Sequence, residues 1–342
     1  MNDGLRIPRD LDAWHHWSAQ QHPLRTLRAR ARPTPVPPPV RTYRNSGASP
    51  TLIVSVASTS TSARAALITP LGQLTDTSIA VVTDIDLAQF LPTWEARTDP
   101  WEPLLASADA VLGDGHYLTL GHEVWAAARR HDIPYFISQH GAITPLAPPL
   151  PPGAHLLAWS DADGAFWTSG RSDVHTTTVG SQLMWEAVLA SRHRADAEDG
   201  KTPLTYAGQL HGAELPRWGM TRAALAFCRA NGAVYRPHPG ERDRLSQAAH
   251  SGFVRAGITL DTDPRPLAAG RGGLVSAFST SVLEAAACGR DAWVHYPNPP
   301  SWLTAFWARY GMRRWGDEPT PAPSLPPEEP SFRIRQVVLA SS

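Results

Sequence analysis

One segment, from Gly273 to Pro300, decides the fold of this chain, and it begins GLVSAFSTSVLEAAACGRDAWVHYP at residue 273. Its pattern predicts a buried strand over 274–278, a hydroxyl-rich turn at 279–281, a short helix over 282–288 and a second strand over 292–296. A strand, a helix and a further strand in this order are the repeating unit of a parallel sheet covered by helices.

The turn of this segment, Ser279-Thr280-Ser281, is a candidate anion site. The first turn of a helix has unpaired N–H groups and a partial positive charge, and three hydroxyls add further hydrogen-bond donors. About forty residues earlier, the stretch YRPHPGE supplies Arg236, His238 and Glu241 at the end of another predicted strand. Two anion-binding strand ends in one α/β region predict a pocket for a phosphorylated, nucleotide-linked ligand.

Composition narrows the class of protein. The 342 residues suffice for two domains, and 31 basic residues balance 31 acidic ones, which argues against a nucleic-acid-binding protein. The two cysteines, Cys228 and Cys288, occupy apolar helix positions, so we expect buried thiols and no disulfide. No stretch reaches the roughly 20 apolar residues of a membrane helix, and the N-terminus lacks the apolar core of a signal peptide. We therefore expect a cytoplasmic protein.

Alternating strand and helix patterns divide the chain. The expected parts are an N-terminal helix and proline-rich spacer (1–49), an N-terminal Rossmann-like domain that binds the acceptor (50–190), a polar linker (191–202), a C-terminal Rossmann-like domain that binds the donor (203–316), and a proline-rich tail (317–342) that is expected to be poorly ordered over 317–330. Ser301 is expected to cap the last helix of the second domain. The N-terminal helix, rich in tryptophan and arginine, has two interpretations. It packs on the domain, or it lies on the inner face of a membrane.

With these motifs identified, the chain resembles GT-B-type bacterial glycosyltransferases. His238-Pro239 and Ser279-Thr280-Ser281 are similar to the HP and ST motifs of sialyl-, polysialyl- and Kdo-transferases. Gln139-His140-Gly141 resembles the His-Gly element of teichoic-acid glycerophosphotransferases, in which the histidine serves as the base. The chain lacks the paired-acidic element of sialyltransferases, and Gly113-Asp114-Gly115 is a partial substitute. The resemblance implies an α/β fold with two Rossmann-like domains whose parallel sheets face a cleft.

The candidate catalytic residues follow predicted strands of the N-terminal half. His140 is the expected general base, because a histidine has a pKa near neutral pH without large perturbation. The alternative for His140 is a histidine that is hydrogen-bonded at the sheet edge. Asp114, with His116 beside it in sequence, is the reserve candidate.

The candidate ligand-binding residues fall into two groups. The expected donor-binding residues are Arg236, His238, Glu241, Ser279, Thr280, Ser281 and Glu284. Further residues expected to face the cleft are Gln139, Gly141, Gln209, His211 and Glu214. Glu284 has two interpretations, a ribose ligand or the acidic partner in a capping box that starts at Thr280 or Ser281. The histidines show no zinc-site spacing, so we expect neither a metal nor a cofactor.

These observations predict a metal-independent glycosyltransferase that moves a sugar from a nucleotide donor, with a CMP-sugar favoured, to a glycan or lipid-linked acceptor of a cell-surface polysaccharide. Two alternatives remain open. One is a glycerophosphotransferase that uses CDP-glycerol, and the other is a nucleotide-sugar-binding protein without catalysis.

Overall fold

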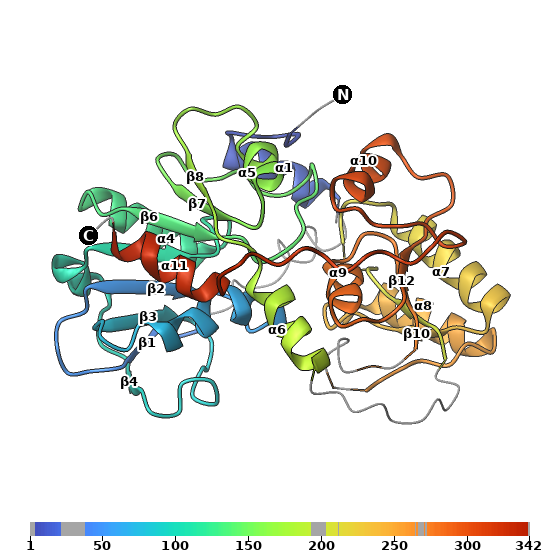
Figure 1. Ribbon diagram of the computed structural model, residues 1–342, viewed down its shortest axis with the longest axis horizontal. Coiled ribbons are helices and arrows are strands. Elements are labelled where there is room, and N and C mark those ends of the chain that lie inside the picture. The colour runs from blue at the N-terminus through green and yellow to red at the C-terminus, as the bar shows by residue number, and fades with distance from the viewer. Residues whose placement is uncertain are drawn as a thin grey trace. The chain divides into compact units, whose positions relative to one another are not determined.

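The computed structural model describes residues 4–21, 38–192, 203–210, 212–263, 265, 270 and 272–340. The chain forms two compact units (Figure 1). The first contains Met1–Leu183 and Leu325–Ser342, and the second contains Met184–Ser324. The division falls inside helix α6 (Gln182–Arg192) and not in the linker that we expected at 191–202. Residues 193–202 of that linker lie outside the described residues.

The first unit is built on one sheet with the strand order β4-β1-β3-β2-β5-β6-β7-β8. Strands β3, β2, β5, β6, β7 and β8 run parallel, whereas β1 is antiparallel to both of its neighbours. The strands are β1 (Arg41–Arg44), β2 (Leu52–Val56), β3 (Ile79–Thr83), β4 (Glu95–Arg97), β5 (Ala110–Gly113), β6 (Tyr135–Ser138), β7 (His155–Ala158) and β8 (His175–Thr178).

Apolar side chains cover both faces of this sheet. Along β2, Leu52, Val54 and Val56 belong to one hydrophobic cluster and Ile53 to another, because successive side chains of a strand point to opposite faces. Val54 pairs with Val81 on one side and with Leu112 on the other. A sheet buried on both faces is typical of parallel α/β folds.

Helices supply the covering layers of the first unit. They are α1 (Leu11–Gln20), α3 (Thr61–Ala63), the π-helical η1 (Arg64–Ile68), the 3₁₀ turns η2 (Thr69–Gln73) and η3 (Glu102–Ser107), α4 (Thr119–Arg130), α5 (Asp161–Thr168) and α11 (Pro330–Leu339). In α4, Leu120, Val124 and Ala127 are buried at helical spacing, so one stripe of the helix packs on the sheet. Helix α1 contains no fully buried residue, and Trp14 donates a hydrogen bond from its ring N–H to the carbonyl of Leu146. The described part of the N-terminal helix therefore lies against the first unit.

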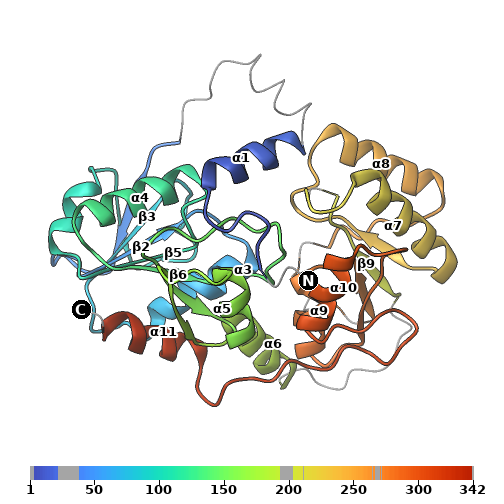
Figure 2. The ribbon, with the colours of Figure 1, turned by 90° about the horizontal axis from the view of Figure 1, so that it is seen from above.

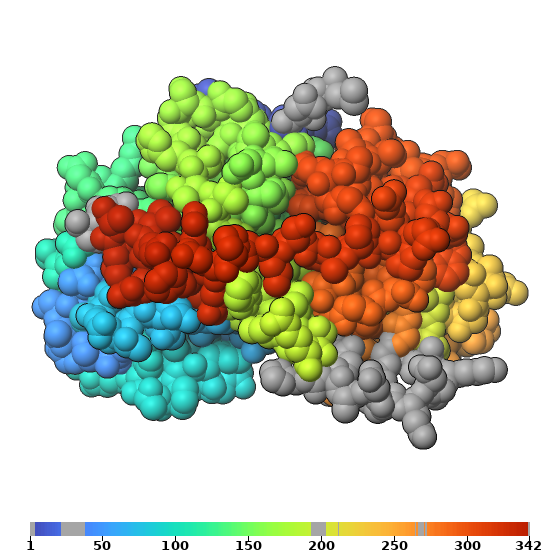
Figure 3. Space-filling view, viewed as in Figure 1, coloured from blue at the N-terminus to red at the C-terminus, as the bar shows by residue number. Residues whose placement is uncertain are grey.

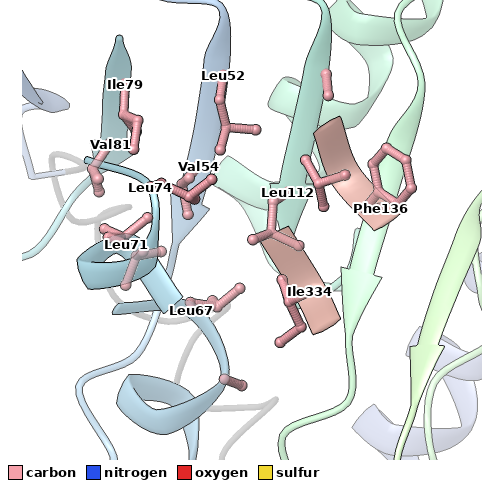
Figure 4. Packing of buried hydrophobic residues seen from close by; sticks show 14 of the residues in the cluster. Leu52, Val54, Leu67, Leu71, Leu74, Ile79, Val81, Leu112, Phe136 and Ile334 are labelled. Atoms are coloured by element: carbon pink, nitrogen blue, oxygen red, sulfur yellow. The ribbon is translucent and has the colours of Figure 1, made fainter. Parts of the chain in front are cut away.

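The C-terminal segment is more ordered than its proline content suggested. Ile334 and Val338 of α11 are buried in the cluster that contains Leu67 and Leu112 (Figure 4). The backbone N–H of Ser331 donates to the side chain of Gln182 at 3.0 Å, and Figure 3 shows α11 at the surface of the first unit. The structure also describes every residue of 317–330, the stretch that we expected to be poorly ordered, and there the N–H of Thr320 donates to the carbonyl of Ala292 at 2.8 Å.

The second unit contains a smaller, wholly parallel sheet with the order β10-β9-β11-β12. Its elements are β9 (Thr205–Ala207), α7 (Arg217–Asn231), β10 (Val234–Arg236), α8 (Arg244–Arg255), β11 (Leu274–Ser276), α9 (Thr280–Ala287), β12 (Ala292–Val294) and α10 (Ser301–Arg309). The strand expected at 258–260 is reduced to one bridge between Leu260 and Tyr235. The chain thus has the expected α/β fold, with two Rossmann-like units.

Two helix starts differ from those expected. Helix α9 is capped by Ser279, whose side chain accepts a hydrogen bond from the N–H of Ser281, and not by Thr280 or Ser281. Helix α10 begins at Ser301, after Pro300 in the cap position, so Ser301 is no cap. In α7 the predicted buried stripe, which includes Met220 and Phe227, is present.

Within the described residues, no helix is long and apolar enough to cross a membrane.

Candidate functional site

The first unit has a topological switch point at β2. Strand β3 lies on one side of β2 and β5 on the other, so the connections that leave these strands diverge at their carboxyl ends, where open α/β sheets generally bind ligands. The residues that follow the strands are the turn 57–60 after β2, Asp84 after β3, Asp114 after β5 and His140 after β6. Parallel strands therefore bring the two predicted catalytic residues to one edge of one sheet.

Asp114 and His140 form an electrostatic pair at this edge. Asp114 is 2% exposed, and burial raises the pKa of its carboxyl group, an effect that the nearby His140 opposes and Asp84 reinforces. The Oδ2 atom of Asp114 and the Nδ1 atom of His140 are both buried and have no hydrogen-bond partner in the described structure. Buried polar atoms are almost always paired, so two unpaired ones in neighbouring groups mark a candidate site.

His116 does not join this pair, although we expected it to accompany Asp114. Its ring stacks on that of His122 and meets Trp125 edge to face at 5.1 Å. Burial lowers the pKa of His116 to about 4, with smaller contributions from the nearby His122 and Arg171. His116 therefore belongs to a separate aromatic cluster.

Gln139 holds the turn that carries His140. Its side-chain nitrogen donates to the carbonyl of Gly141 at 3.0 Å and to Asp163 at 3.1 Å, and its side-chain oxygen accepts from the N–H of Trp159 at 2.8 Å. We expected Gln139 to face the cleft, but it is only 2% exposed, and its side chain is already hydrogen-bonded within the first unit. Its contacts instead fix the backbone of the turn at His140 and Gly141.

Two further features of this edge were not among the residues predicted for the site. The residues Ser58-Thr59-Ser60-Thr61-Ser62 place five successive hydroxyls directly after β2, and Ser60 accepts a hydrogen bond from the N–H of Ala63. Asp84 follows β3 and acts on the pKa of Asp114. A run of hydroxyl residues after a predicted strand is also the feature that marked 279–281 as a candidate anion site. The same criterion applied to 58–62 would have predicted this segment from the sequence.

The second unit has its own switch point, at β9 between β10 and β11. The side-chain oxygen of Gln209, just after β9, accepts from the N–H of Phe278 at 3.0 Å and from the hydroxyl of Ser276 at 3.2 Å. These bonds fasten the two strand ends together. The Ser279 hydroxyl lies 2.8 Å from that of Ser281 at the start of α9. The carboxyl ends of β9 and β11 therefore carry Gln209 and the 279–281 turn, which includes Thr280.

Arg236 and Glu241, both expected to contact the donor, have structural contacts. The Arg236 guanidinium pairs with Asp261 at 3.2 Å and donates to the carbonyl groups of Asp263 and Arg265. The Glu241 side chain is fully buried. Its carboxylate accepts hydrogen bonds from the N–H of Leu210, the hydroxyl of Tyr235 and the ring of His250. Neither group is free to receive a phosphate, so we correct both assignments.

His238 remains accessible. It is exposed, and its Nδ1 atom accepts a hydrogen bond from the N–H of Gly240 at 3.0 Å. The carbonyl of His238 accepts from the N–H of Glu241 at 2.8 Å. A tight turn therefore presents the ring at the carboxyl end of β10, beside the switch point.

Two further carboxylates of the second unit are perturbed. Burial raises the pKa of Glu284 to about 6, with Arg290 opposing the shift and Glu186 adding to it. Because Ser279 is the cap of α9, Glu284 lies beyond the third helical position and forms no capping box. Burial also raises the pKa of Glu214. The remaining cleft candidate, His211, lies outside the described residues.

A surface pocket of about 570 Å³ lies elsewhere in the second unit, beside α8. Its lining consists of Pro237, Glu241, Gln247, His250, Ser251, Val254, Arg255, Leu260 and Thr262. Of the predicted site residues it contains only Glu241. In the described parts of both units, no group of three or more metal-ligating side chains is arranged to hold an ion.

Comparison with known proteins gives distant structural likenesses. No model of a known protein family matches the chain, and no curated protein matches it. The structure of MurG from Acinetobacter baumannii is similar at 13% identity and a TM-score of 0.37, over 84% of this chain and 91% of that chain. The structure of Anabaena Alr3699/HepE in complex with UDP and glucose is similar at 14% identity and a TM-score of 0.40, over 85% of this chain and 89% of that chain.

Proposed function

We propose that this chain is a glycosyltransferase that moves a sugar from a nucleotide donor to a hydroxyl group of a cell-surface glycan precursor. The observation that carries the proposal is the proximity of the buried Asp114 and the half-buried His140 at the switch point of the first unit, where each side chain keeps a buried polar atom without a hydrogen-bond partner. Transfer to a hydroxyl needs a general base, and an imidazole beside a carboxyl group is suited to that role.

In this mechanism His140 removes the proton of the acceptor hydroxyl as its oxygen bonds to the anomeric carbon of the donor sugar. The bond from that carbon to the donor phosphate breaks, and the nucleotide leaves with the electron pair. Asp114, next to His140, stabilises the imidazolium that forms. Gln139 acts through its hydrogen bonds to Gly141 and Trp159, which keep the histidine turn in place.

The donor phosphate is assigned to the second unit. The start of α9, with Ser279 and Ser281, supplies hydroxyl and N–H donors at the carboxyl end of β11, and this arrangement favours an anionic leaving group. His238 is exposed at the end of β10 and is the second proposed phosphate contact. Glu284 is the proposed ribose contact. A CMP-sugar is the favoured donor because of the resemblance carried by His238-Pro239 and Ser279-Thr280.

The decisive experiment joins a donor panel to two substitutions. Wild-type protein is titrated calorimetrically with CMP, CDP, UDP and GDP, and transfer from the corresponding donors to glycan precursors is followed by mass spectrometry. His140→Ala should lower turnover by about 10²–10⁴-fold with donor affinity nearly unchanged. Asp114→Asn should also lower turnover, whereas His131→Ala, at an exposed histidine on the end of α4, should not.

Other outcomes would redirect the assignment. Transfer of glycerol phosphate from CDP-glycerol would make the chain a glycerophosphotransferase. Tight nucleotide binding without any product would make it a binding protein. If His140→Ala retains full turnover, the base is a different group and the proposed role of the pair is wrong.

A further inference from the structure

Two neighbouring helices of the second unit carry only positive charge. Helices α7 and α8 lie side by side (Figure 2), and together they contain five arginines and no carboxylate. The chain as a whole has equal numbers of basic and acidic residues, so this is a local concentration of charge. A surface of one sign attracts a partner of the opposite sign.

The first turns of these helices are joined. The guanidinium of Arg217, at the start of α7, lies 2.6 Å from the carboxylate of Asp243 and 3.2 Å from the hydroxyl of Ser246. Asp243 also caps α8 by accepting hydrogen bonds from the N–H groups of Leu245 and Ser246. The contacts hold the two helix starts together, and the charge of Asp243 is neutralised by Arg217.

The first turns of α7 and α8 also carry exposed apolar side chains. Trp218 is 71% exposed and Leu245 is 54% exposed, which is unusual for large apolar groups on helices that otherwise pack on a sheet. Arg222 lies one turn after Trp218, and Arg244 precedes Leu245. Both arginines are exposed, and neither has an ion-pair partner among the described residues. We call Trp218, Arg222, Arg244 and Leu245 the basic rim.

We propose that the basic rim docks the protein on an anionic lipid surface. Tryptophan places its ring at the level of lipid headgroups, leucine enters the acyl boundary, and arginine is attracted to acidic phospholipids. The rim is formed by helices that begin at the carboxyl edge of the second sheet, where the ligand site of this unit is proposed. Membrane docking there is independent of whether the chain transfers a sugar.

The composition of the rim favours lipid over two other anionic partners. A nucleic-acid site needs a longer basic track that contacts several phosphates, and the rim offers two unpaired guanidinium groups. A stable protein partner buries about 800 Å² on each side, with a polar rim around an apolar centre, whereas the basic rim has only two large apolar side chains. Interleaved aromatic, aliphatic and basic side chains suit the membrane interface.

The test is co-sedimentation of the full chain with lipid vesicles. Phosphatidylcholine vesicles containing phosphatidylglycerol should bind the protein, pure phosphatidylcholine vesicles should bind it much less, and added salt should weaken binding. Trp218→Ala should lower the partition coefficient several-fold. The double variant Arg222→Gln, Arg244→Gln should lower it by more than tenfold, since each basic group near an acidic surface contributes about fivefold.

The matched control uses the same two helices. Arg229→Gln and Arg255→Gln remove the same charge from the opposite ends of α7 and α8, and they should change the partition coefficient much less. The proposal is wrong if acidic vesicles do not bind the protein, or if the rim and control variants lose binding equally. It is also wrong if the rim variants bind like wild type, since another segment then contacts the lipid. Full competition by DNA, with no effect of Trp218→Ala, would indicate a general polyanion site instead.

Discussion

The ring nitrogen Nε2 of His250 lies 2.7 Å from Oε2 of Glu241, a carboxylate that has no exposed surface. The same carboxylate accepts hydrogen bonds from the hydroxyl of Tyr235 at 3.0 Å and from the N–H of Leu210 at 2.9 Å. Three elements of the second unit thus meet at one side chain: the end of β10, helix α8 and the loop after β9. Glu241 therefore holds the carboxyl edge of this sheet together.

Replacing Glu241 with alanine should destabilise the second unit by roughly 3–5 kcal/mol, because several buried donors lose their acceptor. Urea unfolding followed by circular dichroism measures the change. Glu241→Gln keeps one acceptor oxygen and should cost less. Glu318→Ala, at an exposed glutamate of the same unit, is the control and should have little effect. If Glu241→Ala unfolds like wild type but loses nucleotide affinity, the carboxylate contacts the donor after all.

Helix α11 should be essential to the first unit. Ile334 is 2% exposed and packs in the cluster that contains Leu67 and Leu112, so Ile334→Ala should lower the free energy of unfolding by roughly 2–5 kcal/mol through lost contacts and a cavity. Leu118→Ala, at a leucine that is 40% exposed in the same unit, should change it by much less. Equal effects of the two substitutions on urea unfolding would show that α11 is not part of the core.

The buried parallel strands were predictable from sequence, and the edges of the first sheet were not. Strands such as β2 and β3 are continuous apolar runs, which give a strong local signal. Strand β8 reads His-Thr-Thr-Thr, with its first two residues exposed. Strand β1, next to the edge strand β4, has an arginine at each end. Such short polar segments become strands through pairing with a sheet that already exists, which is a tertiary effect.

In the candidate site, too, local sequence signals were readable and tertiary contacts were not. His140 and Asp114 were each predicted on their own, because each follows an apolar run in the sequence. They lie near each other because β5 and β6 are neighbouring strands of the sheet. The roles of Arg236 and Glu241 were misjudged because their partners, such as Asp261 and His250, come from other loops and helices. Sequence identifies which polar groups lie at strand ends, but the structure is needed to show which of them are already paired.

His116 should make the first unit sensitive to acid. The pKa of His116 is about 4 in the folded protein and 6.5 in an unfolded chain. As the pH falls below 6.5, the unfolded state therefore binds a proton at this histidine, whereas the folded state does not bind it until the pH is near 4. Stability is therefore lost between pH 6.5 and pH 4, by roughly 3 kcal/mol in all. His116→Phe keeps a ring against Trp125 and should remove this part of the pH dependence.

The measurement is the difference in unfolding free energy between His116→Phe and wild type across this pH range, from urea titrations. The difference should move in favour of the variant as the pH falls. His131→Gln, at an exposed histidine of the same unit, is the control substitution. A constant difference between His116→Phe and wild type would contradict the buried, neutral state of His116.

Glu284 should have the opposite pH dependence, and it separates a structural carboxylate from a ligand-binding one. Burial and the nearby Glu186 raise its pKa from 4.5 to about 6, so the folded state holds a proton that the unfolded state releases earlier. Stability therefore falls as the pH rises from 4.5 through 6, and above that range the ionised group costs roughly 2 kcal/mol. Glu284→Gln removes this cost, so the variant should be more stable than wild type at pH 8 and about equally stable at pH 4. Glu186→Gln should give a smaller gain in stability at pH 8, because it removes only the repulsion.

If Glu284 contacts the ribose of a donor, the same Glu284→Gln protein should bind the preferred nucleotide several-fold more weakly in calorimetry. A variant that gains stability and keeps full nucleotide affinity would exclude Glu284 from the donor site.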